Sequence, residues 1–538
     1  MRKIFFIIQQ KSALSLVDWD NLINEQDPEM ILVLISEQGS IDSLGTQAKK
    51  SFTAIIELEQ FEFVQAKQEM DKIFAQYYQM GDQSNIATLH EFQLELVAQL
   101  RDHYREAFNI QGPGIDVIQN FRNKLLMKKH LGPKGVKLPN YTEFDSEAYK
   151  HNPEAYLQSI EQLLGFPMFA KPVDSAGSLN TAFIQDTEAL RAWSNKASES
   201  SHVYEIDEYI DGILFHCDSV VQNGQVQFTL VSQYLHPNAD ALSGKALATM
   251  TLNPGAEDYK RLKQFAEEAL SHFPILPDGV THLEVFKKTS NNELVFLEVA
   301  ARAPGGVAPE MYQIRTGVDI RQLHLRLHLG LSIEDPIKQL HDQSKWGPFA
   351  SMYQLVAPYH GGTISKLKPP VFHGGGYKIE WRCRENDIIK PASSIANVIV
   401  STVFWNDDYD ALEQDFRLLD QQQIVEIIPT QVYLLQEHFN RLETLGCTST
   451  SYPPTFFSKR NLAIGAASMF SQISAQAANT LGPNSSVTTE VDPVMFLGLL
   501  VSSVAILVLI VYALYKVSPT PKDVNKDEEY LVPAQSFL

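Results

Sequence analysis

Apolar and polar positions along the chain follow two periods, one of about two residues and one of about 3.6, which are typical of strands and amphipathic helices. The first apolar run, Ile4–Ile8, is too short for the core of a signal peptide and lacks a small-residue cleavage site, so it predicts a buried first strand. Two β-prone runs, 283–286 and 294–299, flank a turn of Lys, Thr, Ser and Asn and predict a hairpin.

The same patterns predict the other elements of a folded body. These are a helix over about 115–130, a strand, loop and strand over 165–184, two strands over 203–226 with turns at Asp211-Gly212 and Asn223-Gly224, a helix over about 318–329, and a strand, helix and strand over about 396–427. No internal repeat is apparent in the sequence.

One long apolar run near the C-terminus differs from everything before it. Residues 494–515 carry no charge and are long enough to cross a hydrocarbon core about 30 Å thick, which predicts a transmembrane helix. The stretch 446–493 is rich in Ser, Thr, Ala, Asn and Gln and predicts a flexible tether, and 516–538 is a polar, acidic tail. We therefore expect the folded body to end near Leu445.

The charges around this run conflict with a cytosolic body. Lys516, Lys522 and Lys526 follow the run, whereas Glu490 and Asp492 precede it, so the positive-inside rule places the tail in the cytosol. A large N-terminal body without a signal peptide has no evident export route, however. We therefore expect a single-pass tail anchor in the membrane that leaves the body in the cytosol.

Composition narrows the classes of function. The chain has 538 residues, of which 44% are hydrophobic and 20% charged, so it is long enough for more than one globular domain. Its formal net charge of -20 argues against a general nucleic-acid binder, because Lys and Arg are what hold a phosphate backbone. The three cysteines are far apart and form no C-x-x-C pair, which fits a reducing compartment and supports neither a zinc site nor thiol catalysis.

Two glutamates face each other across the predicted hairpin. If its turn centres on Asn291, Glu284 and Glu298 are directly opposite, with Cβ atoms about 5 Å apart, and like charges so placed are destabilising. A hard divalent cation, Mg²⁺ or Mn²⁺, would relieve this repulsion and take its remaining ligands from water and phosphate. The alternative is a solvated outer face on which the pair has no function.

A second candidate feature is the loop after the strand that ends at Lys171. Small residues over 174–178 let backbone N–H groups approach a phosphate, and Lys171 would add a positive charge. The loop is not a Walker loop, since the lysine precedes the glycine, and a tight hairpin explains the same residues without a ligand. Upstream, Lys124 and Lys128 lie one helical turn apart, and we expect Lys128 to lie mainly on a solvated face.

In their order along the chain these pieces resemble the ATP-grasp superfamily, specifically its carboxylate–amine (or thiol) ligases, over most of residues 1–445. The matching motifs are Asn123-Lys124 to Lys128 on a helix; Pro167 to Lys171-Pro172 before a small-residue loop; Asp207-Glu208-Tyr209-Ile210-Asp211-Gly212 at a hinge; and His282 to Glu284, Leu297-Glu298 to Arg302 and Gly305-Gly306 around the hairpin. The segment 86–104 is also similar to the N-terminal domain of that family, where a strand leads into a helix.

The resemblance implies an α/β (α+β) ATP-grasp fold of three subdomains, with ATP between the two halves of the grasp, plus one C-terminal transmembrane helix. It implies boundaries at 1–110 for an N-terminal α/β domain, 111–330 for the ATP-grasp domain and 331–445 for a C-terminal α/β subdomain. The implied roles are phosphate binding by Lys124 and Lys171; closure over the phosphates by Ser175, Gly177 and Ser178; adenosine binding by Asp207, Glu208, Tyr209 and Ile210; Mg²⁺ binding by Glu284 and Glu298; catalysis by Lys171 and Arg302; and substrate binding by His282, Arg302, Gly305 and Gly306.

The activity that the resemblance implies is ADP-forming ligation: a carboxylate, of an amino acid or small acid, attacks the γ-phosphate of ATP, and an amine or thiol captures the acyl phosphate. Two positions depart from the family pattern. Leu214 stands where a ribose-binding carboxylate is common, which would leave that contact to Asp207, and Ala300 stands where many members have a metal-binding Asn. The alternatives are a degenerate ATP-binding scaffold at a membrane and a secreted bacterial effector whose acidic KDEEY tail is its signal.

Overall fold

The computed structural model describes residues 2–429 except 11–13, 15–16, 20–21, 23–29 and 359, and these residues lie within one compact unit. Among them, no helix combines the length and the apolar character that crossing a membrane requires. The predicted tether 446–493, transmembrane helix 494–515 and tail 516–538 lie outside the described residues and stay predictions.

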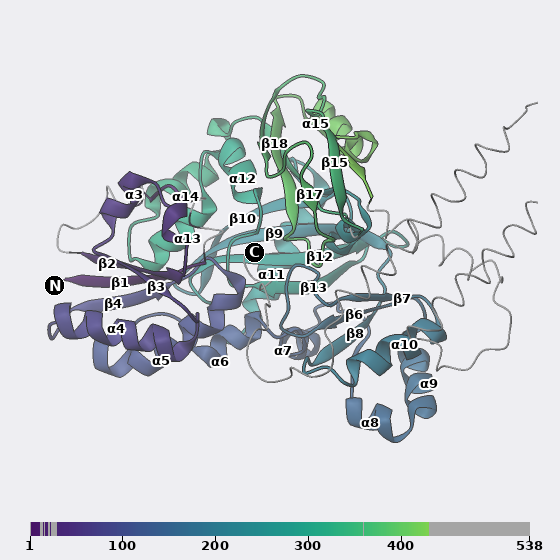
Figure 1. Cartoon of the computed structure of the whole chain (residues 1–538), viewed down its shortest axis with the longest axis horizontal. Helices are drawn as coiled ribbons and strands as arrows, with labels where there is room; N and C mark the ends of the chain where they lie inside the picture. Colours follow the sequence, from purple (N-terminus) through teal and green to yellow (C-terminus); the bar gives the residue numbers. More distant parts are fainter. Residues whose placement is uncertain are drawn as a thin grey trace, which may run out of the picture. The chain divides into compact units, whose positions relative to one another are not determined.

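The N-terminal part of the chain is built on a parallel sheet of order β3-β2-β1-β4. Its strands are β1 (Lys3–Ile8), β2 (Ile31–Glu37), β3 (Ala54–Leu58) and β4 (Gln83–Ala87). α4 (Phe63–Tyr77) and α5 (Leu94–Phe108) pack on one face, and α13 (Ile320–His328) contributes Leu325 to the core on the other face (Figure 1). Cover on both faces buries β1 from Ile4 to Ile8, so the predicted first strand is confirmed.

A four-stranded antiparallel sheet of order β5-β8-β6-β7 follows along the chain. Its strands are β5 (Tyr141–Glu143), β6 (Met168–Pro172), β7 (Ala182–Ile184) and β8 (Tyr204–Glu208). Three helices bury apolar residues against it, namely α8 (Ser146–His151), α9 (Pro153–Leu164) and α10 (Thr187–Ala197). The strand, loop and strand predicted over 165–184 are β6, β7 and the loop between them.

An eight-stranded sheet of order β13-β12-β9-β10-β11-β14-β18-β16 has antiparallel neighbours throughout. Its strands are β9 (Gly212–Gln222), β10 (Gln225–Tyr234), β11 (Leu247–Thr251), β12 (Gly279–Lys288), β13 (Leu294–Ala300), β14 (Phe349–Val356), β16 (Gly376–Trp381) and β18 (Val398–Asn406). α11 (Glu257–Ser271) covers one face, and α12 (Ala308–Thr316), α13 and α14 (Glu334–His341) cover the other. Strands from beyond residue 330 thus complete the sheet that carries the hairpin.

Three short strands form the last described sheet, in the order β17-β15-β19. They are β15 (Gly362–Leu367), β17 (Ile388–Ile389) and β19 (Val425–Ile428), and α15 (Tyr409–Arg417) buries Leu412 and Phe416 in the core beside them. The strand, helix and strand predicted over 396–427 are therefore confirmed as β18, α15 and β19. The helix predicted over 318–329 is confirmed as α13.

The helix predicted over 115–130 is broken in the structure. α6 (Ile115–Ile118) passes into a 3-10 turn, and α7 (Lys124–Leu131) begins anew, because the Asn123 side chain accepts hydrogen bonds from two backbone N–H groups of its first turn. The apolar periodicity continues through this cap, so the pattern of hydrophobic positions did not reveal the break.

Candidate active site

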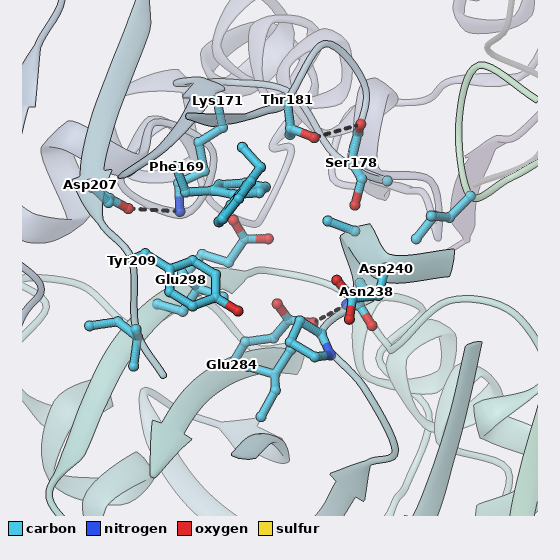
Figure 2. Close-up of a pocket in the computed structure, with 18 of the residues that line it drawn as sticks. Phe169, Lys171, Ser178, Thr181, Asp207, Tyr209, Asn238, Asp240, Glu284 and Glu298 are labelled. Carbon is cyan, nitrogen blue, oxygen red and sulfur yellow. Dashed lines mark hydrogen bonds and ion pairs between the residues drawn. The ribbon is translucent and has the colours of Figure 1, made fainter. Parts of the chain in front are cut away.

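Most of the predicted site residues line one cavity of about 590 Å³, which lies between the four-stranded sheet and strands β12 and β13 (Figure 2). Residues from the loop between β6 and β7, from the link between β8 and β9, and from the hairpin all contribute to its wall. The predicted residues that line it are Lys124, Lys171, Ser175, Gly177, Ser178, Asp207, Glu208, Tyr209, Ile210, Glu284 and Glu298. His282, Arg302, Gly305 and Gly306 lie outside this lining.

The hairpin register places the two glutamates opposite each other, as predicted. Glu284 of β12 pairs directly with Glu298 of β13, and a bulge follows immediately, after which Val285 pairs with Phe296. Glu284 is 5% exposed, whereas the side chain of Glu298 is 32% exposed and lies 3.4 Å from Nζ of Lys124. The pair therefore combines one buried and one accessible carboxylate on the same wall of the cavity.

One oxygen of Glu284 is held by several donors. Oε1 accepts a hydrogen bond from Nδ2 of Asn238 at 2.9 Å (Figure 2). It also accepts one from the Tyr234 hydroxyl at 3.0 Å, and Nε2 of His282 lies 3.5 Å from it. Burial opposes ionisation, but the contacts with His282 and Tyr234 outweigh it and hold the pKa of Glu284 below its usual value. Because all three approach Oε1, the second oxygen, Oε2, is left for a cation.

Across the cavity, two lysines and two acids form a buried ion-pair cluster. Nζ of Lys171 lies 3.2 Å from Oε1 of Glu205 and 3.1 Å from Oδ2 of Asp207, while Nζ of Lys128 lies 3.0 Å from Oε2 of Glu205 and also bonds Oδ1 of Asp207. Burial is the largest influence on the pKa of Lys171 and lowers it, but Asp207 and Glu205 reverse the effect and raise that pKa above its usual value. Burial likewise opposes ionisation of Asp207, and the two lysines hold its pKa below the usual value.

The expectation that Lys128 lies on a solvated face is wrong, because its side chain is fully buried. α7 buries Met127 and Leu131 in the core beside β9, β12 and β13, while Lys128 contacts the acids of β8 and lies 4.7 Å from the centroid of the Tyr141 ring. The structure does not favour the expectation that Asp207 binds ribose. Its Oδ1 already pairs with Lys128 and its Oδ2 with Lys171.

The loop between β6 and β7 has an unusual backbone and is held by two sets of hydrogen bonds. Gly177, Ser178 and Asn180 all have positive φ angles, of 66°, 55° and 57°, a backbone conformation of the kind that can present N–H groups to an anion. Nζ of Lys124 donates to the Ser175 carbonyl at 2.7 Å. The Gly177 carbonyl accepts from the backbone and the side chain of the segment 394–395, which follows β17. These hydrogen bonds hold the loop against residues 394–395.

Apolar side chains also line the cavity. They come from β6, from the link between β8 and β9, from the start of β9 and from the hairpin: Phe169, Ile210, Leu214, Phe286, Phe296 and Leu297. In the link, the backbone N–H of Tyr209 donates to the Pro167 carbonyl at 3.1 Å, and Glu208 is held by Asn140 and lies 3.6 Å from Lys288. The wall of the cavity therefore combines apolar side chains with lysines and carboxylates.

Sequence reasoning missed a polar segment that also lines the cavity. Asn238 and Asp240 lie on a 3-10 turn, Asn238–Ser243, and Lys245 follows it. This segment carries no recognisable motif. Only its position along the chain could have indicated that it lines the cavity. The segment follows β10, β10 pairs with β9, and β9 pairs with β12 of the hairpin.

His282 belongs to a buried network behind Glu284. Its Nδ1 lies 2.7 Å from Oδ1 of Asp218, whose other oxygen bonds Nδ1 of His216 at 2.7 Å and the Tyr312 hydroxyl at 2.5 Å. Burial lowers the pKa of His282, but Asp218 outweighs this effect and raises the pKa to about 9. The ligand atoms of the two histidines and the aspartate lie within 4.8 Å of one another, yet each Nδ1 already bonds the aspartate, so we interpret the group as a hydrogen-bonded network.

Arg302 and the two glycines lie beyond the hairpin. Nε of Arg302 pairs with Glu91 of the N-terminal domain, and its Nη1 donates to the Ala303 carbonyl at 2.7 Å. Gly306 has a φ angle of 60°, and a Cβ atom there would lie 2.4 Å from Oε1 of Gln354, so a larger residue would be both strained and obstructed.

Comparison with known proteins agrees with this geometry. Residues 131–323 match the family model described as D-ala D-ala ligase C-terminus. An L-arginine-specific L-amino acid ligase of Bacillus subtilis is 23% identical over 271 residues, which are 49% of this chain and 61% of that protein. The chain thus spans about three fifths of the length of this relative.

Solved structures show the same fold. An L-amino acid ligase from Bacillus licheniformis superposes with a TM-score of 0.58 and 18% identity, covering 80% of this chain and 99% of that one. The biotin carboxylase domain of Hydrogenobacter thermophilus 2-oxoglutarate carboxylase, in complex with MgADP, superposes with a TM-score of 0.53 and 15% identity, covering 79% and 90%. The described part of this chain therefore has the ATP-grasp fold, and the comparisons agree with the prediction of an ATP-grasp ligase.

Proposed function

We propose that this protein is an ATP-dependent, ADP-forming ligase that joins a carboxylate to an amine through an acyl phosphate. The observation that carries the proposal is the pairing of Glu284 with Glu298 on one wall of a cavity whose opposite wall holds Lys171 and the small-residue loop. Carboxylates facing lysines across a cavity fit a metal–nucleotide complex, whose charges they match on both sides. The D-ala D-ala ligase and L-amino acid ligase likenesses support the same class of reaction.

The residues present fit a divalent cation and ATP. Oε2 of Glu284 and the accessible carboxylate of Glu298 would hold Mg²⁺ or Mn²⁺, which, when bound, neutralises charge on the β- and γ-phosphates. Lys124 and Lys171 would bind phosphate oxygens beside the loop 175–178, because both lysines line the cavity and Nζ of Lys124 contacts the loop at Ser175. The apolar lining, together with the backbone of residues 208–210, would hold the adenine ring.

The proposed reaction needs no reactants other than ATP, a carboxylate and an amine. A carboxylate oxygen bonds to the γ-phosphorus and ADP leaves; the amine nitrogen then bonds to the acyl carbon, phosphate leaves with the carboxylate oxygen, and the amine loses a proton. Acyl phosphates are hydrolysed easily, so the site must exclude water during the second step. The loop 174–181 lies over the cavity and is fastened to residues 394–395, which makes it the part of the chain suited to this task.

The substrate class follows from the similar proteins rather than from the cavity. Because the family likeness and the Bacillus licheniformis fold both come from ligases of amino acids, we propose an amino acid as the carboxylate donor and an amine as the acceptor, with a thiol as the variant acceptor. A scaffold that binds ATP without turnover is the second candidate, favoured by Leu214, which places an apolar side chain in the cavity wall where family members often have a ribose-binding carboxylate.

Turnover separates the two candidates. Purified protein with MgATP and pairs of amino acids should release ADP in proportion to a new condensed mass detected by mass spectrometry. The Glu298→Gln protein, which keeps its size and its place on β13, should release none. Nucleotide binding without ADP release in any mixture would favour the scaffold.

We further propose that residues 494–515 anchor the protein in a membrane as a C-terminal tail anchor with the folded body in the cytosol. The support for the span is the uncharged run itself, and the support for the orientation is that the proposed reaction needs ATP. Protein lacking residues 446–538 should remain in the soluble fraction and keep its ATP affinity, since every proposed ligand precedes residue 431. Release of the full-length chain by alkaline carbonate would contradict the anchor, and protection of the body from protease in sealed membranes would contradict its orientation.

A further inference from the structure

The backbone of the loop residues 175–178 is hydrogen-bonded on its acceptor side only. All four carbonyl oxygens accept hydrogen bonds, and in chain order their donors are Nζ of Lys124, the N–H of Leu179, the segment 394–395 and the hydroxyl of Thr181. No backbone N–H group of residues 175–178 donates to another group in the part of the chain that the structure describes. Because its acceptors are taken and its donors are free, this stretch of backbone is suited to an anion.

The Gly177 carbonyl differs from the other three because both of its donors come from far along the chain. It accepts from the Ser394 hydroxyl at 3.0 Å and from the Ile395 N–H at 3.3 Å. A trans peptide is planar, so the C=O of one residue and the N–H of the next point in opposite directions. Two donors on the Gly177 carbonyl therefore fix the direction of the Ser178 N–H, and Ser178 lines the cavity (Figure 2). Without them, the freedom of a glycine would let this peptide turn.

The turn that carries Ser394 is fixed by its own hydrogen bonds. Oδ1 of Asn397 accepts from the backbone N–H groups of Ser393 at 3.0 Å and Ser394 at 3.1 Å. The Asn397 N–H donates to the Ser394 carbonyl at 3.1 Å. Oγ of Ser394, a residue that is 3% exposed, accepts from the Ala396 N–H at 3.2 Å. A hydroxyl has a single hydrogen to donate, so that of Ser394 is directed to the Gly177 carbonyl.

This turn also reaches the cavity itself. The side of Ile395 lines the cavity, whereas every other residue of the lining precedes residue 299. The turn lies between β17 and β18, beyond the residues 131–323 that match the family model and beyond the last motif of the sequence, Gly305-Gly306. A part of the chain that carries none of these motifs therefore contributes to the wall beside the loop.

We propose that Ser394 is a positioning residue for the ligase reaction. With the Ile395 N–H, its hydroxyl holds the peptide between Gly177 and Ser178 so that the Ser178 N–H donates to a phosphate oxygen of the bound nucleotide. Ser394 itself lies outside the cavity lining and acts through the loop backbone. A loop held in this way also keeps water from the acyl phosphate, whose hydrolysis would return the acid and phosphate and so release ADP without product. This inference rests on the proposed ligase function.

Hydrogen–deuterium exchange tests the loop without requiring turnover. A peptide spanning residues 174–181 is followed with and without Mg²⁺ and the non-hydrolysable analogue adenosine 5′-(β,γ-imido)triphosphate. In wild type the free N–H groups should exchange fast, and the bound analogue should protect them. Ser394→Ala removes one of two hydrogen bonds to the Gly177 carbonyl, so the protection should fall about three- to tenfold.

Three further variants isolate the hydroxyl. Ser394→Thr keeps it and should restore the protection, whereas Ser394→Val has the same shape without it and should behave as Ser394→Ala, so the pair remains informative where added size perturbs the turn. Ser393→Ala is the matched control, because Ser393 is exposed on the same turn, and it should behave as wild type.

The ratio of ADP to condensed product is the second readout. With MgATP and a pair of amino acids, wild type should form equal amounts of the two. Ser394→Ala should release more ADP than product, because a loosened loop admits water to the acyl phosphate. A purely structural role of Ser394 would lower the melting temperature and the rate but leave this ratio unchanged.

The outcomes that contradict the proposals differ from one another. Wild-type protein that binds the analogue but forms no condensed product in any mixture would overturn the ligase function. Binding of the analogue that leaves residues 174–181 of wild type unprotected would overturn the role of the loop, and with it that of Ser394. Equal protection and an equal ratio of ADP to product in the Thr and Val variants of Ser394 would overturn the positioning role and leave the ligase function intact.

Discussion

Replacing Lys128 by methionine should destabilise the folded body while removing no side chain from the cavity wall. Nζ of Lys128 lies 3.0 Å from Glu205 and bonds Asp207, and the Lys128 and Glu205 side chains are both 0% exposed. Without Lys128, two buried carboxylates would share Lys171 alone, at 3.2 and 3.1 Å. Breaking a buried ion pair by removing one partner costs about 3–5 kcal/mol. Because the Lys128 and Glu205 side chains are both shielded from solvent, we expect the full cost.

A second substitution tests the electrostatic origin of this cost. Adding Glu205→Gln to Lys128→Met leaves one lysine and one aspartate, so the double variant should recover roughly 1–3 kcal/mol relative to additivity. Lys129→Met is the matched control, since Lys129 is exposed on the same helix and should change stability by less than about 0.5 kcal/mol.

Urea unfolding of five proteins, namely wild type, the double variant and the single variants Lys128→Met, Glu205→Gln and Lys129→Met, followed by circular dichroism and by tryptophan fluorescence, measures these differences. With slopes of about 1–3 kcal/mol per molar urea, Lys128→Met should lower the midpoint by about 1 M or more. A midpoint within about 0.3 M of the wild-type value, or no recovery in the double variant, would refute the view that the four charges act as one buried cluster.

The remaining predictions concern the site itself. Glu284→Gln should abolish ADP formation while the melting temperature changes little, and normal turnover at saturating Mg²⁺ would remove Glu284 from the metal site. Lys171→Ala should weaken MgATP binding by roughly 2–5 kcal/mol in calorimetry at fixed salt, and an affinity equal to that of wild type would mean that the loop after β6 does not bind phosphate. The pKa of His282 is raised to about 9 from an ordinary 6.5, so the stability that its charge contributes is complete below about pH 6.5 and is lost as the pH rises through about 9. Unfolding midpoints from pH 6 to 10 should therefore fall for wild type more steeply than for His282→Gln, and parallel curves would contradict the ion pair with Asp218.

The register of the hairpin could be predicted because it depends on local pattern alone. Side chains alternate along strands, and a turn centred on Asn291 puts Glu284 opposite Glu298, as the structure has it. The buried first strand followed in the same way from an unbroken apolar run.

The surroundings of Lys128 could not be predicted from its helix. Whether a lysine on a helix faces water depends on what packs against that face, and here the partners are on β8, far along the chain. The pairing of Arg302 with Glu91 is similar, since it joins the edge of one sheet to the loop after a strand of another. Asn238 and Asp240 escaped notice because a short polar turn has no periodicity that could reveal which wall it lines.

The most direct test of the central claim follows oxygen from the carboxylate. With an amino acid labelled with oxygen-18 in its carboxyl group, MgATP and an acceptor amine, an acyl phosphate must carry one labelled oxygen into phosphate at each turnover. The account predicts one oxygen-18 atom per phosphate released, measured by mass spectrometry, in step with ADP and condensed product. Phosphate that carries no label while ADP accumulates would show attack by water on ATP and would contradict the ligase mechanism.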